Sequence, residues 1–240
     1  MKKILVLIFA IIIWRVKILL TGVLIPKIGF IKKLVDSVEW LNSAHIVQLS
    51  MLIIAILLII IIGKSKFSNF GFKGAPLKTV FRSVFLAFGV SLVLFLTFGI
   101  YMKITSSVAS SGVPFMEDTF LSKIILVWII ASSVEEIFYR GFLQTYMEPL
   151  KAIGLKFGKV YLSLPVILTA LMFGFMHLCL KGKLPWQMVR FIIFNATVLG
   201  LIAGYYREKT GSLIPAYFVH LTFNVVGMGL PQVLMMVMKG

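Results

Sequence analysis

The chain has 240 residues, of which 60% are hydrophobic and 13% are charged, whereas soluble domains carry roughly 25% charged residues. This composition excludes a soluble globular domain. The net charge of +16 does not indicate nucleic acid as a partner, because Lys and Arg cluster in short loops between apolar runs, as membrane topology requires.

Apolar runs of the length that crosses a bilayer, about 20 residues, follow one another along the whole chain. We expect the first to be a retained helix, because residues 14–17 (WRVK) stand where a signal peptide would need small residues for cleavage. An eighth, short or tilted helix is expected between Pro26 and Ser43. The sequence therefore predicts an all-α fold, a polytopic transmembrane helical bundle of about seven to eight helices in one integral membrane domain over residues 1–240. The predicted spans are Ile4–Ile25, His45–Ile62, Val80–Ile104, Phe120–Tyr146, Leu164–Leu180, Trp186–Tyr206 and Leu213–Met238.

The distribution of basic loops predicts how the spans are oriented. The loops Gly63–Lys78 and Pro149–Lys159 are basic, whereas Thr105–Thr119 has no Lys or Arg and carries two acidic residues. With seven spans this gives a cytoplasmic N-terminus and an external C-terminus in a multi-pass protein of the cell (plasma) membrane. The two lysines of residues 181–183 would then lie outside, against the general trend.

Two adjacent glutamates, Glu135 and Glu136, lie inside the fourth predicted span. A charge near the bilayer centre costs at least about 2.5 kcal/mol, so an intramembrane carboxylate marks a candidate functional site. Residues four apart share a helix face, so Glu136 and Arg140 are expected to pair. Glu135 points about 100° away and has no evident local partner, which leaves it free for proton transfer. The structural alternative is a buried ion pair that only fixes helix packing.

Two later spans add the other scarce polar groups. His177 follows Phe173 by one turn, next to Gly174, which lets another helix approach closely. His220 and Asn224 lie four residues apart, so both side chains can donate hydrogen bonds toward one point, as an oxyanion site requires. Each pair alone is equally consistent with helix packing. Together with the glutamates they predict one assembled site over a motif core of residues 120–226.

These segments resemble the CAAX protease and bacteriocin-processing enzyme family, also called Abi or CPBP intramembrane proteases. The family motifs Glu-Glu-x-x-x-Arg, Phe-x-x-x-His and His-x-x-x-Asn stand here, in that order, at residues 135–140, 173–177 and 220–224. Type II prenyl endopeptidases of this family remove the last three residues of a lipidated Cys-a-a-X tail. The resemblance implies a lipidated or membrane-anchored peptide or protein as substrate, within membrane lipids.

The same resemblance implies roles for the individual residues. Glu135 and His177 would activate a water, His220 and Asn224 would stabilise the oxyanion, and Glu136 and Arg140 would support the site. We expect no cofactor, because no close-set ligand pair such as His-x-x-x-His is present. The alternative is a zinc ion held by Glu135, His177 and His220, residue types that suit that metal.

Two other functions use the same residues. A membrane binding or immunity-type protein would carry the polar cluster as a recognition site without turnover. A transporter with a proton relay would favour internal repeats and broken helices in both halves, but the cluster lies wholly in the second half. Cleavage of a lipidated peptide, compared between the natural chain and Glu135→Ala, separates an enzyme from both alternatives.

Overall fold

A computed structural model describes residues 2–37, 43–63, 66–104 and 124–230. The chain is mainly helical, which confirms the predicted fold class. Its longer α-helices are α1 (Lys2–Leu19), α2 (Gly29–Ser37), α3 (Ser43–Gly63), α4 (Leu77–Ile104), α8 (Leu164–Met176), α9 (Trp186–Thr210) and α10 (Leu213–Asn224). Shorter helical turns are Leu20–Leu24, Ile25–Lys27, Phe67–Phe70, Glu148–Leu150, His177–Leu180 and Val225–Gly229.

Among the residues that the structure describes, four helices are long and apolar enough to cross a membrane: Lys2–Lys27, Ser43–Gly63, Leu77–Lys103 and Trp186–Thr210. Two more predicted spans form shorter apolar helices, Leu164–Leu180 and Leu213–Gly229. The chain is therefore a multi-pass helical membrane protein. The expected extra helix between Pro26 and Ser43 is α2, which is only nine residues long.

The fourth predicted span is helical from residue 124 to residue 146 but changes its winding along the way. The α-helical turns α6 (Ser132–Glu136) and α7 (Gln144–Tyr146) alternate with π-helical turns at Ile124–Ala131 and Ile137–Leu143. Wide π-helical turns inside α-helices occur frequently at functional sites. The glutamate pair lies at the end of α6, where the winding changes. The predicted outside loop 105–119 lies beyond the described residues.

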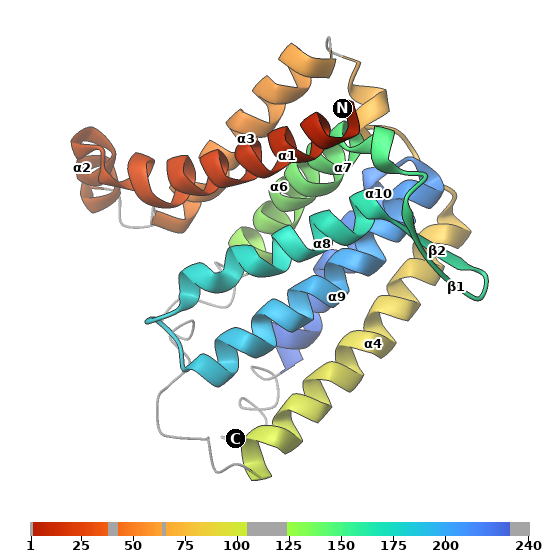
Figure 1. Cartoon of the computed structure of the whole chain (residues 1–240). Helices are drawn as coiled ribbons and strands as arrows, with labels where there is room; N and C mark the ends of the chain where they lie inside the picture. Colours follow the sequence, from red (N-terminus) through yellow and green to blue (C-terminus); the bar gives the residue numbers. More distant parts are fainter. Residues whose placement is uncertain (1, 38–42, 64–65, 105–123, 231–240) are drawn as a thin grey trace.

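The helix with the glutamates lies in the middle of the bundle, with α1 and α3 on one side and α8, α9 and α10 on the other (Figure 1). Helices α8 and α9 pack most extensively because small residues face each other there. A side chain at Gly174 would collide with Thr197, and one at Gly200 would lie 2.8 Å from the Cα atom of Ala170. Gly174 is therefore the packing position that the sequence predicted, and Gly200 is a second position of close approach between the same helices.

A two-stranded hairpin, β1 (Gly154–Phe157) and β2 (Val160–Ser163), is an element that the sequence pattern did not predict. It begins within the segment Pro149–Lys159 that was expected to be a basic loop and continues to the residue before α8, and most of its side chains are exposed. Each strand has only four residues, which is too short for a clear alternation of apolar and polar positions. Its turn has Gly158 at φ 58°, a value that favours glycine.

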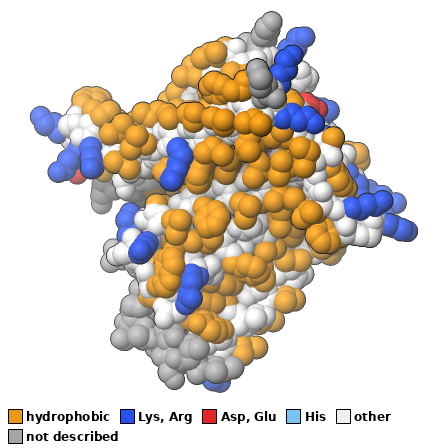
Figure 2. Space-filling model, in the orientation of Figure 1, with side chains coloured by type: hydrophobic (Ala, Val, Ile, Leu, Met, Phe, Trp, Pro, Cys, Tyr) orange, Lys and Arg blue, Asp and Glu red, His pale blue; other side chains and the backbone are white. Residues whose placement is uncertain are grey.

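The molecular surface shows broad apolar areas with lysines and arginines at their margins (Figure 2). Many large apolar side chains are exposed on α1, α3 and α4, such as Ile61 at 72% and Phe85 at 74%. In water such a surface would be unstable, but in lipid it is the expected exterior. Basic residues of three segments predicted to be cytoplasmic, Lys66, Lys151 and Arg207, meet at one end of the bundle.

Candidate active site

Helix α10 carries two of the predicted site residues, and its start is fixed by two residues. Gly211 ends α9 with φ 69°, in the left-handed region that favours glycine. Ser212 then caps α10, because its hydroxyl accepts a hydrogen bond from the Ile214 amide at 3.2 Å. The same hydroxyl donates to the Lys73 carbonyl at 2.6 Å, which ties the start of α10 to the segment before α4. His220 therefore stands two turns into a firmly anchored helix.

The predicted pair of Glu136 and Arg140 is present and completely buried. Arg140 Nη1 donates to Glu136 Oε1 at 2.9 Å, and the two side chains are 0% and 1% exposed. The guanidinium also lies over the Phe173 ring, 4.8 Å from its centre. Its Nε and Nη2 atoms have no hydrogen-bond partner among the described residues. Such a pair is costly to break, because either partner left alone would be an uncompensated buried charge.

His220 joins the two glutamates. Its Nδ1 lies 2.9 Å from Glu136 Oε1, so this carboxylate oxygen binds the arginine and the histidine together. Its Nε2 lies 3.7 Å from Glu135 Oε2. Because a carboxylate oxygen only accepts hydrogen bonds, Nδ1 carries a proton in this arrangement. Nε2 is thereby left facing the neighbouring glutamate.

Glu135 is 9% exposed, and its partners come from distant parts of the chain. Gln48 of α3 donates to its Oε1 at 3.0 Å, although the two residues are 87 positions apart. Within the described part of the chain, Glu135 thus has no hydrogen-bond partner on its own helix, in agreement with the expectation, but it has one on α3. The Gln48 amide holds one oxygen in place and leaves the other directed toward His220.

Lys17 of α1 is a buried charge near the same site that the sequence interpretation missed. Its side chain is 2% exposed, and its ammonium interacts electrostatically with the Glu135 carboxylate. It also lies 4.9 Å from the Phe138 ring centre and 5.0 Å from that of Tyr139. The sequence did contain a signal for this residue and for Gln48. Lys17 is a charged residue inside the first predicted span, and Gln48 is a polar residue inside the second.

His177 lies near His220, and both contact Phe173. The Phe173 ring makes edge contacts with both imidazoles, each with ring centres 5.3 Å apart. His177 Nδ1 is 3.0 Å from the Phe173 carbonyl oxygen. A carbonyl only accepts, so Nδ1 carries the proton and Nε2 of a neutral ring is available as a base. The His177 ring also interacts electrostatically with Glu135 and His220.

Asn224 follows His220 by one turn, as predicted, but its amide is bonded elsewhere. Its Nδ2 donates to Ser132 Oγ at 2.9 Å and to the Val127 carbonyl at 3.3 Å. Both N–H donors that an oxyanion would need are therefore engaged with the helix before the glutamates. To donate to a substrate, Asn224 has to exchange at least one of these bonds.

The zinc alternative requires Glu135, His177 and His220 to converge on one ion. Within the described ranges, no group of three His, Cys, Asp or Glu side chains is arranged to hold a metal. Each histidine directs only Nδ1 at another partner, the Phe173 carbonyl or Glu136, as zinc-bound histidines also do, so these bonds do not decide against a metal. Because the three side chains do not form a metal-binding group, the described residues do not fit a zinc site in this conformation.

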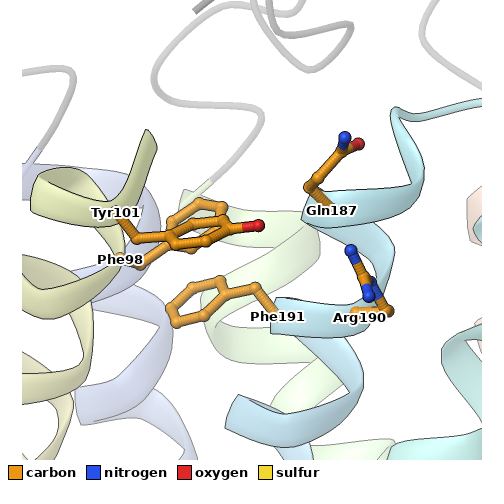
Figure 3. A pocket seen from close by; sticks show the side chains of 5 residues that line it. All are labelled: Phe98, Tyr101, Gln187, Arg190 and Phe191. Atoms are coloured by element: carbon orange, nitrogen blue, oxygen red, sulfur yellow. The ribbon is translucent and has the colours of Figure 1, made fainter. Parts of the chain in front are cut away.

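Two hollows open on the surface away from these residues. One, of about 280 Å³, lies between the lower parts of α4 and α9 and is lined by Phe98, Tyr101, Gln187, Arg190 and Phe191 (Figure 3). The other, of about 550 Å³, lies at the opposite, basic end of the bundle and is here named the basic-end cavity. It is lined by Ile62, Gly63, Lys66, Ser68, Asn69, Phe70, Lys73, Gln144, Thr145, Glu148, Lys151, Pro165, Arg207, Glu208 and Gly211. Neither hollow is lined by a motif residue.

Fold and site together define a multi-pass helical membrane protein with a buried cluster of glutamates and histidines. Residues 117–226 match the model of a protein family described as type II CAAX prenyl endopeptidase Rce1-like. This part of the chain is therefore an Rce1-like domain, which confirms the resemblance drawn from the motifs. Comparisons with curated proteins and with solved structures gave no match.

Proposed function

We propose that the chain is an intramembrane endopeptidase that hydrolyses a peptide bond near the C-terminus of a lipidated or membrane-bound substrate in the cell membrane. The observation that carries the proposal is the His220 imidazole between Glu135 and Glu136, buried inside a membrane helix. Membrane proteins place ionisable groups at this cost where they have a function. The match of residues 117–226 to a prenyl endopeptidase family supports the same chemistry.

In the proposed reaction, Glu135 is the general base. A water oxygen attacks the carbonyl carbon of the scissile bond while its proton passes to the Glu135 carboxylate, with His177 Nε2 orienting the water. When the C–N bond breaks, the protonated Glu135 returns the proton to the leaving amine nitrogen. Gln48 leaves this exchange possible because it binds only one of the two carboxylate oxygens.

The other motif residues act on the developing oxyanion. His220 takes part as the imidazolium and keeps both protons throughout the reaction: its Nε2–H donates to the oxyanion of the tetrahedral intermediate, and Glu136 stabilises the positive charge through Nδ1. Asn224 provides a second donor after it releases Ser132 or Val127. Arg140 binds the same Glu136 oxygen as His220 does and so holds the carboxylate in position. Removing one such donor typically lowers kcat by about 10²–10³.

The test is cleavage of a prenylated or otherwise lipidated peptide by the purified full chain, followed by mass spectrometry of the products. The matched variants are Glu135→Gln in the site and Asp36→Asn, which removes an exposed carboxylate on α2. Cleavage by the natural chain and by Asp36→Asn, but not by Glu135→Gln, supports the proposal.

A strong zinc chelator is the second arm of the same experiment. Cleavage that survives chelation agrees with a glutamate-activated water. Activity that is lost on chelation and restored by zinc would establish the metalloprotease alternative. If no lipidated or membrane peptide is cleaved, the binding or immunity-type alternative takes the place of the protease.

A further inference from the structure

The basic-end cavity has no part in the proposed reaction. It opens where α3 and α9 end, between the segment before α4 and the start of α8. Its volume of about 550 Å³ lies within the range of roughly 300–1,000 Å³ that is typical of small-molecule sites. The cavity is therefore large enough for a polar headgroup but not for a folded partner.

The charges around the cavity favour an anion. Four basic and two acidic side chains line it. One of the acids, Glu208, is already paired with Lys151 at 3.5 Å and accepts a hydrogen bond from Ser163 at 2.6 Å. Within the described residues, no carboxylate forms an ion pair with Lys66 or Lys73, and both side chains are exposed at the rim. These two lysines are available to an anionic ligand.

The buried wall of the cavity contains polar atoms without a partner. Arg207 is 7% exposed; its Nη2 donates to the Asn69 carbonyl and to Thr145 Oγ1, while its Nε has no partner. Gln144 is 6% exposed and donates to the Gly204 carbonyl, while its Oε1 has no partner. Both atoms are shielded from solvent, Arg207 Nε beside Gly71 and Gln144 Oε1 beside Gly204, so a ligand does not reach them. The charges of the cavity that an anionic ligand can reach are therefore those of the two rim lysines.

The surroundings of the cavity point to a lipid as the source of that ligand. Ile62 lines the cavity, and it continues into Ile60 and Ile61 at the exposed end of α3. These three side chains are 43%, 41% and 72% exposed. Acyl chains attached to a headgroup in the cavity would lie along this apolar surface. Basic pockets between membrane helices on the cytoplasmic side are suited to anionic headgroups.

From these observations we propose that the basic-end cavity binds the headgroup of an anionic phospholipid. The lysines of the rim bind its phosphate. The site is separate from the glutamate–histidine cluster and does not depend on whether the chain is a protease.

The experiment uses the delipidated full chain in a neutral detergent and measures lipid binding by native mass spectrometry. Phosphatidylglycerol is the probe, with phosphatidylcholine as the zwitterionic comparison. The double variant Lys66→Gln/Lys73→Gln removes the rim charges. The matched control is Lys156→Gln/Lys159→Gln, which removes the same charge from the β1–β2 hairpin, away from the cavity lining.

We expect the natural chain and the hairpin variant to bind phosphatidylglycerol with the same affinity within about twofold, and more tightly than phosphatidylcholine. The rim variant should lose about tenfold in affinity, equivalent to 1.4 kcal/mol. An equal loss in the hairpin variant, or equal binding of the two lipids, would overturn the proposal. Glycerol 3-phosphate is the soluble comparison; if it binds as tightly as the lipid, the ligand is a soluble phosphate and the lipid assignment is wrong.

Discussion

Arg140 offers the most direct test of how the site is held together. In Arg140→Ala, Glu136 loses the guanidinium at 2.9 Å and keeps only His220, while its Oε2 already lacks a partner. Because Glu136 is 1% exposed, water cannot replace the lost bond without opening the bundle. Removing one member of a buried pair costs about 3–5 kcal/mol, a large fraction of a total stability of about 5–15 kcal/mol.

This cost predicts a clear change in thermal stability. At about 2–4 °C per kcal/mol for a domain of this size, Arg140→Ala should lower Tm by about 6–20 °C. The measurement is thermal unfolding in detergent followed by tryptophan fluorescence, together with the yield of monodisperse protein. Arg190→Ala is the matched control, because Arg190 is exposed and forms no ion pair with any described residue.

A double variant separates loss of the pair from loss of packing. Glu136→Leu/Arg140→Met removes both charges and keeps most of the side-chain volume, so it should recover much of the stability while remaining inactive. The reasoning is refuted if Arg140→Ala lowers Tm no more than Arg190→Ala does. It is equally refuted if the double variant is less stable than the single one.

Three further substitutions test other parts of the site. Glu135→Gln keeps an oxygen acceptor for Gln48, so Tm should stay within about 2 °C while peptide cleavage is abolished. A large fall in Tm would instead assign Glu135 to packing. Lys17 forms no direct ion pair with a carboxylate of the described residues, unlike Arg140, so Lys17→Met removes a buried charge without breaking a pair and should leave Tm unchanged or higher. We expect its kcat to fall by about tenfold because the ammonium interacts with Glu135, and unchanged kinetics would exclude that role. In Gly174→Ala the new methyl group collides with α9, so the free energy of unfolding, measured with a chemical denaturant, should fall by about 1–3 kcal/mol. Gly227→Ala is the control, because the space around Gly227 is open and the free energy of unfolding should fall much less. Equal losses in the two variants would contradict the close packing.

The parts of the site that could be predicted from sequence are those fixed by local geometry. The pairing of Glu136 with Arg140 follows from their spacing of four residues. The contact of His220 with the glutamates could be expected because ionisable groups of membrane helices face the interior of the bundle and pair with one another. By contrast, Gln48 reaches Glu135 across 87 residues, a distance over which helix periodicity carries no information. The bonds of Asn224 depend on how α10 packs against the helix at Val127.

The same distinction holds for the fold. Hydropathy located the membrane helices because each consists of a long apolar run, and it placed a short helix where α2 is found. It could not locate the change from α to π winding around Glu135, because both forms have similar composition. The hairpin of β1 and β2 was missed because four-residue strands on an exposed surface leave no periodic pattern.

The contacts of Glu135 have a consequence for the design of fragments and chimeras. Gln48 and Lys17 belong to α3 and α1, whereas the family match begins only at residue 117. A minimal fragment that starts at the match would contain every motif residue, yet Glu135 would lose both its amide donor and its nearby ammonium. Exchanging the N-terminal helices between homologues would therefore change the surroundings of this carboxylate without altering a motif residue.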